Sequence, residues 1–234
     1  MMVAGLECFD TNLIPHIGIF ALGVAMFTPL GATLALPALK SKWESLDTKL
    51  GQSFAGMLLI CLSGFTVSAH TLWMHNKAQE MGGGSFCSAG TVCDCASVIG
   101  NSDWNTVPYL GLPWGLTGML VFALFMWAII TMAKEPTAEW VLTNIKLGTN
   151  VGIIGIFVIL YLMYAEFKIG KICQFCTLAH IAHIGATIGF FRLANMYGTS
   201  DWAKVSSLKS VDVVAKQRRQ RGGYVAPTQI NEEE

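Results

Sequence analysis

The segment KICQFCTLAHIAH, residues 171–183, places two cysteines three positions apart, directly before an apolar run. A C-x-x-C pair can bind a metal ion, exchange with a disulfide, or lie inert in a core. The apolar run is long enough for a helix that crosses a bilayer, which needs about 20 residues. The segment therefore predicts a membrane helix that begins with a pair of cysteines.

The composition is that of a membrane protein. Of the 234 residues, 53% are hydrophobic and 13% are charged, whereas soluble domains carry about 25% charged residues. The formal net charge is zero, which gives no sign of nucleic-acid binding. Five apolar blocks can each cross a bilayer as a helix, so we expect an all-α protein whose first partner is the lipid bilayer. They are Leu13–Leu39, Gln52–Trp73, Val107–Met132, Asn150–Phe167 and Ile172–Leu193.

Basic residues predict how these spans are oriented. Twelve of the 15 lysines and arginines lie in segments on one predicted side, and the other side holds Lys77, Lys168 and Lys171. Because cytoplasmic loops are enriched in basic residues, we expect the N-terminus outside and the C-terminal tail inside. The loop between the second and third spans then faces outward, as does the start of the last span. In a bacterial inner membrane this is the oxidising side, where disulfides persist.

Five of the seven cysteines fall in the outer loop or at the outer start of the last span, and Cys8 lies near the N-terminus on the same side. The run Cys93-Asp94-Cys95 has a C-x-C spacing, whereas zinc sites favour C-x-x-C pairs, so we predict redox chemistry and no metal. The unpaired N–H groups at a helix start favour a thiolate, and so do Lys168 and Lys171, which lie just upstream of the C-x-x-C pair. The thiolate is the species that attacks a disulfide. The seven cysteines are Cys8, Cys61, Cys87, Cys93, Cys95, Cys173 and Cys176.

Two sets of cysteines in one membrane protein predict an electron relay. Electrons would pass from a soluble partner to the loop cysteines, and from these to the C-x-x-C pair. The pair then needs an acceptor at membrane depth. The chain has no haem-attachment, flavin or nicotinamide motif, so a lipid-soluble quinone of the ubiquinone or menaquinone type is the expected cofactor.

The order of the motifs resembles the vitamin K epoxide reductase family. Loop cysteines are followed by ASVIGNSDW, then by GLPWGLTG, and then by C-x-x-C on the last membrane helix. The resemblance covers residues 52–193 and implies a four-helix transmembrane bundle around a quinone pocket, with an outer cysteine loop at 75–106. Residues 1–51 then form an extra N-terminal membrane helix and a cytoplasmic linker, and residues 194–234 form a polar cytoplasmic tail.

The resemblance also implies roles for individual cysteines. Cys176 is similar to the cysteine next to the quinone, and Cys173 to its resolving partner. Cys95 is expected to exchange with Cys173, and Cys87 to meet the outside partner. Cys93 is extra to the family pattern, and by spacing it can replace Cys95 in either step. A short helix is expected directly after these cysteines, around residues 96–100.

Three polar residues are expected at the quinone. His180 lies one helical turn beyond Cys176 on the same face and is expected to donate a hydrogen bond to a quinone carbonyl. Asn101 or Ser102 stands where the family commonly has a serine, and either can supply the equivalent hydrogen bond. His183 turns away from that face and is expected to be structural.

The same pattern is compatible with two other functions. A DsbB-type quinone reductase has its C-x-x-C pair early and its spaced pair late, which is the reverse of the order here. A structural or assembly subunit of a larger membrane complex would keep the fold with little turnover, and the first span or the tail would contact its partner. We favour a thiol–disulfide oxidoreductase that supports disulfide formation outside the cytoplasm. Its thiol donor is expected to be a separate thioredoxin-like periplasmic protein.

Overall fold

The computed structural model describes residues 10–28, 33, 46, 48–80, 88–89, 93–101 and 103–204. Within these ranges nearly every residue belongs to a helix, as expected for an all-α membrane protein. In chain order the elements are η1 (Thr11–Leu13), α1 (Ile14–Met26), α3 (Lys49–Glu80), β1 (Ser88–Ala89), β2 (Cys93–Asp94), α4 (Cys95–Ile99), α5 (Trp114–Lys134), α6 (Val141–Ile169) and α7 (Gln174–Met196).

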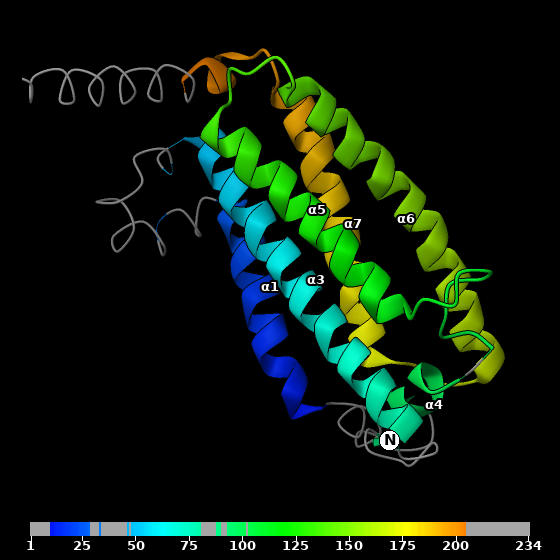
Figure 1. Cartoon of the computed structure of the whole chain (residues 1–234). Coiled ribbons are helices and arrows are strands. Elements are labelled where there is room, and N and C mark those ends of the chain that lie inside the picture. Colours follow the sequence, from blue (N-terminus) through cyan, green and yellow to red (C-terminus); the bar gives the residue numbers. More distant parts are fainter. Residues whose placement is uncertain are drawn as a thin grey trace, which may run out of the picture.

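Helix α3 is the centre of the bundle. It packs against α1, α5 and α7, while α6 packs mainly on α7 (Figure 1). Short α4 lies near the end of α3, at the same end of the bundle as the start of α7. Large apolar side chains fill the interior between the helices, among them Phe125, Phe190 and Met57, each at most 1% exposed. The bundle therefore brings the outer loop and the C-x-x-C segment to one end.

Three of the described helices are long and apolar enough to cross a membrane, namely α3, α5 and α6. Helix α7 has 23 residues, and α1 has 13. Most of the first predicted span beyond residue 28 lies outside the described residues. The protein is thus an α-helical membrane protein, and the count of five spans stays a prediction.

Several predicted boundaries differ from the helices. The fourth span was expected from residue 150, but α6 already begins at Val141. The third span was expected from residue 107, but α5 begins at Trp114, directly after Pro113. Proline has no backbone N–H, but at this position no helical hydrogen bond is lost, because the first N–H groups of a helix have no partner within it. Helix α3 continues to Glu80, beyond residue 75 where the outer loop was expected to begin.

The first residues of the predicted polar tail pack on the bundle. Trp202 is 5% exposed, and its ring nitrogen donates to the Pro136 carbonyl at 2.9 Å. Its ring also meets the Phe54 ring edge-on, with centroids 6.0 Å apart. The polar tail was predicted to begin at residue 194, but Trp202 still belongs to the packed part of the protein. Residues 205–234 lie outside the described part.

Helices α1 and α3 approach each other closely at two glycines. A Cβ added at Gly23 would lie 2.9 Å from the Gly56 carbonyl oxygen and 2.9 Å from the Ile60 backbone nitrogen. Small residues allow backbones to approach in this way in membranes, where packing replaces the hydrophobic effect between helices. The extra N-terminal helix is therefore fitted to the bundle rather than loosely attached.

We expect Gly23→Ala to destabilise the protein by about 1–3 kcal/mol, because the added methyl group has no room against α3. Gly18→Ala on the same helix is the matched control, since a Cβ there has nothing within 4 Å. Thermal unfolding in detergent micelles measures both. Equal midpoints for the two variants would contradict the close contact.

Candidate active site

The C-x-x-C pair lies at the junction of α6 and α7. Helix α6 ends at Gly170, whose φ of 69° is the left-handed conformation that glycine adopts readily. The chain then extends through Cys173, which is the N-cap of α7. The Cys173 sulfur accepts a hydrogen bond from the Cys176 backbone N–H at 3.2 Å. The first cysteine of the pair thus begins the helix that carries the second.

Three sulfur atoms come together at this junction. The Sγ atoms of Cys173 and Cys176 are 2.6 Å apart, and the Cys173 side chain also has a hydrogen bond with Cys95. Cys173 is fully buried and Cys95 is 1% exposed, while Cys176 is partly exposed. All three are free thiols. The sulfur of Cys173 therefore lies between the sulfurs of Cys95 and Cys176, and the three form a row of sulfur atoms.

The outer loop is held against this junction by main-chain contacts. Strand β2 pairs with β1 in antiparallel register, and Cys93 forms a parallel bridge with Ile172. The Asp94 N–H donates to the Ile172 carbonyl at 3.3 Å. Helix α4 then begins at Cys95, close to the expected 96–100, and the Asp94 side chain caps it by accepting from the Ser97 N–H at 3.0 Å.

Cys93 and Cys95 differ in oxidation state. Cys93 is disulfide-bonded, and its partner sulfur lies outside the described residues, where Cys87 and Cys8 also fall. Cys95 is a reduced thiol and faces Cys173. By spacing alone, Cys93 and Cys95 are interchangeable. In the structure their surroundings differ.

Only some of the interactions that were expected to stabilise a thiolate are present. The Cys176 N–H reaches the Cys173 sulfur, but burial raises the pKa of the Cys173 thiol well above its usual range. Desolvation of a charged sulfur outweighs one hydrogen bond to it. Lys168 is directed to the Tyr164 ring, with Nζ 5.4 Å from its centroid. Cys173 therefore needs a proton acceptor before it can react.

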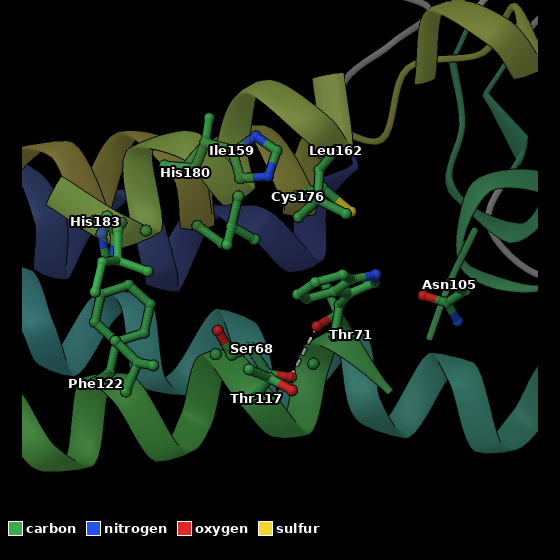
Figure 2. A pocket seen from close by; sticks show the side chains of 18 of the residues that line it. Ser68, Thr71, Asn105, Thr117, Phe122, Ile159, Leu162, Cys176, His180 and His183 are labelled. Carbon is green, nitrogen blue, oxygen red and sulfur yellow. Dashed lines mark hydrogen bonds between the residues drawn. The ribbon is translucent and has the colours of Figure 1, made fainter. Parts of the chain in front are cut away.

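A cavity of about 270 Å³ opens beside Cys176 (Figure 2). Cys176 and Asn105 lie at one end, and His183 and Phe122 at the other. Most of the lining is apolar, from α5, α6 and α7. The polar side chains on its wall are Ser68, Thr71, Asn105, Thr117, His180 and His183.

The two histidines of α7 have different surroundings. His183 has its Nε2 3.0 Å from the Gly152 carbonyl, so its ring N–H is used within the bundle. His180 also lines the cavity, and no described residue has a hydrogen bond with its ring. Both histidines line the cavity, so His183 does not turn away from it as expected, although its ring is bonded within the bundle. The hydrogen bond of His180 to a quinone carbonyl stays a prediction.

Asn105 lines the cavity, and Asn101 does not. The Asn101 side chain instead accepts from the Asp103 N–H at 3.0 Å, inside the turn, and Ser102 lies outside the described residues. Asn105 contacts the Ile99 carbonyl and His75 through its amide nitrogen, which directs its oxygen to the cavity. We therefore replace Asn101 with Asn105 as the candidate. The amide just before the third span was the signal in the sequence.

The N-terminal segment contacts both middle residues of the C-x-x-C pair. The Asp10 N–H donates to the Gln174 side chain at 3.2 Å, and the ring of His16 on α1 meets the Phe175 ring edge-on, with centroids 6.5 Å apart. The His70 ring of α3 lies 4.6 Å from the Phe175 ring. His16 of α1 is 3.3 Å from His70 and 3.0 Å from the Thr66 hydroxyl. Because that hydroxyl donates to the Ser63 carbonyl, it accepts from His16, and His16 in turn accepts from His70.

The donor atoms of Glu166, Cys173 and Cys176 all lie within 4.8 Å of one another. A closed zinc site takes four ligands, so we assign no metal to these three.

A family model described as the vitamin K epoxide reductase family matches residues 55–189. The matched range begins inside α3 and ends inside α7, so it contains every described cysteine and the whole cavity. Helix α1 lies before it. No curated protein matches the chain.

We expect alkylation to distinguish the two loop cysteines. Cys93 should react only after reduction, because it is in a disulfide, whereas Cys95 should react without reduction but only once the protein is unfolded, because it is buried. Cys61, a free thiol that is 0% exposed, is the internal control for unfolding. Peptide mass spectrometry gives the result, and a dominant linkage between Cys93 and Cys173 would contradict this assignment.

Proposed function

Since the chain belongs to the vitamin K epoxide reductase family, we propose that it passes electrons from an external dithiol protein, through its loop cysteines and the C-x-x-C pair, to a quinone. Membership implies an oxidoreductase, and the helices make it a membrane protein. The thioredoxin-like donor, the quinone and the outer face of a bacterial inner membrane are part of the proposal.

The row of sulfur atoms carries this proposal. Cys173 contacts Cys95 on the loop side and Cys176 on the cavity side. Thiol–disulfide exchange needs an attacking sulfur next to a disulfide sulfur, and Cys173 can exchange with either neighbour without moving far. Cys95 takes the exchange step in this scheme, and Cys87 with Cys93 meets the external dithiol.

The cavity suits the ring of a quinone. Its wall is mostly apolar, and its few polar groups lie where they can orient a flat ring with oxygen atoms at opposite ends. His180 is placed to donate to a carbonyl oxygen, and the Asn105 oxygen to accept from the hydroxyl of the reduced form. A quinone supplies the capacity to accept two electrons and two protons. Cys176, at the rim, is the sulfur that would face it.

The direct test is reduction of a soluble ubiquinone or menaquinone analogue by the purified protein with a dithiol. We expect turnover in the wild type and a loss of at least about 100-fold in Cys176→Ala, because the nucleophilic sulfur is removed. Cys61→Ala is the matched control and should turn over normally.

Asn105→Ala and His180→Ala should each raise the KM for quinone about 5- to 10-fold, the effect of one lost hydrogen bond. A folded wild type without turnover would instead support a structural subunit.

A second prediction separates the roles of the two cysteines in the pair. In Cys173→Ala, the Cys176 thiolate has no sulfur partner within the pair, so we expect a charge-transfer absorbance band when quinone is added. Cys176→Ala should show none. A band in Cys176→Ala alone would mean that the roles are reversed.

A further inference from the structure

We propose that Glu166 carries the proton of the Cys173 thiol each time the C-x-x-C pair is oxidised or reduced. The inference rests on the proposed function and adds a catalytic residue to it. The family resemblance assigned no role to this carboxyl group.

The last turn of α6 fixes Glu166 beside the cysteines. Its main-chain carbonyl accepts from the N–H groups of Gly170, at 2.9 Å, and Lys171, at 3.3 Å. Its side-chain Oε1 accepts from the Cys173 N–H at 3.3 Å. A carboxyl oxygen and the sulfurs of Cys173 and Cys176 all lie within 4.8 Å of one another. The carboxyl group is thus next to the reacting atoms and held there by the backbone.

Cys173 needs such a neighbour because it has no access to water. The residue is 0% exposed, and only its thiolate can attack a disulfide. Its two sulfur neighbours, Cys95 and Cys176, are themselves thiols in the reduced protein. Among the described residues, Glu166 is the carboxyl group in this cluster. It is partly exposed, so it can pass a proton on to solvent.

The atoms and electrons balance as follows. Oxidation converts the thiols of Cys173 and Cys176 into one S–S bond and releases two electrons and two protons. The electrons leave to the quinone, which takes up two protons in total. Glu166 accepts the proton of Cys173 as its sulfur attacks, and then releases it. Reduction of the pair takes two exchange steps. Cys95 attacks Cys173 and the Cys176 sulfur leaves, which forms a Cys95–Cys173 disulfide. A second loop cysteine then attacks Cys95, and Glu166 returns a proton to the Cys173 sulfur as it leaves.

A purely structural role predicts something different. Glutamine is isosteric with glutamate, and its amide oxygen can still accept from the Cys173 N–H. If Glu166 only holds the turn, Glu166→Gln will behave as the wild type. If it transfers a proton, the substitution removes that function and leaves the turn in place.

The experiment compares Glu166→Gln with Glu139→Gln, an exposed carboxyl group in the connection between α5 and α6. Two rates are measured across pH: quinone reduction driven by a dithiol, and, without quinone, reduction of the Cys173–Cys176 disulfide by dithiothreitol, followed by acid quench and peptide mass spectrometry. The titratable groups that face the carboxyl are Cys95 on α4 and the two cysteines of the pair.

We expect Glu166→Gln to slow both rates about 100-fold at pH 7, a typical effect of losing a general base. The difference should shrink as the pH rises, because a growing fraction of the thiols is then already ionised without a base. Glu166→Asp should recover part of the rate, and Glu139→Gln should match the wild type. If Glu166→Gln keeps the wild-type rate and pH profile in the quinone-free assay, the inference is wrong.

The quinone-free assay separates the two proposals. A wild type that fails to reduce quinone, but whose disulfide is reduced more slowly in Glu166→Gln, would overturn the proposed function and support the role of Glu166. Normal quinone turnover in both the wild type and Glu166→Gln would support the proposed function and overturn the role of Glu166.

Discussion

The hydrogen bond from the Cys176 N–H to the Cys173 sulfur connects the fold to its chemistry. It is the N-cap of α7, and an N-cap satisfies backbone groups that the helix leaves unpaired. The same sulfur touches Cys95 and Cys176, so the atom that begins the helix is also the one that would exchange disulfides. Its burial keeps the Cys173 sulfur away from solvent and raises the pKa of its thiol. The Glu166 carboxyl group beside it is the acceptor that we propose for its proton.

Much of this organisation could be predicted from the sequence, because it depends on local patterns. Apolar length gives membrane helices, and the spacing of Cys173 and Cys176 gives a pair at a helix start. The short helix after Cys95 follows from its local residues. The position of His180 one turn beyond Cys176 follows from helical periodicity alone.

Other features depend on how distant segments meet, and one sequence does not contain that information. Asn101 and Asn105 look equivalent in the chain, and only the folding of the loop turns one inward. Cys93 and Cys95 are two residues apart, and the disulfide of Cys93 gives them different environments. Glu166 lies within the predicted fourth span, and its contact with Cys173 depends on the left-handed turn at Gly170.

Helix α1 lies outside the range that the family model matches, yet its segment touches Gln174 and Phe175 between the two cysteines. Helix α1 can therefore complete its contacts only after α7 has been synthesised. During synthesis the loop cysteines are available well before α7 exists, and at that stage no C-x-x-C pair lies beside them to take electrons. The C-x-x-C pair is thus completed last, and an incomplete chain lacks the two cysteines that the proposed electron relay requires.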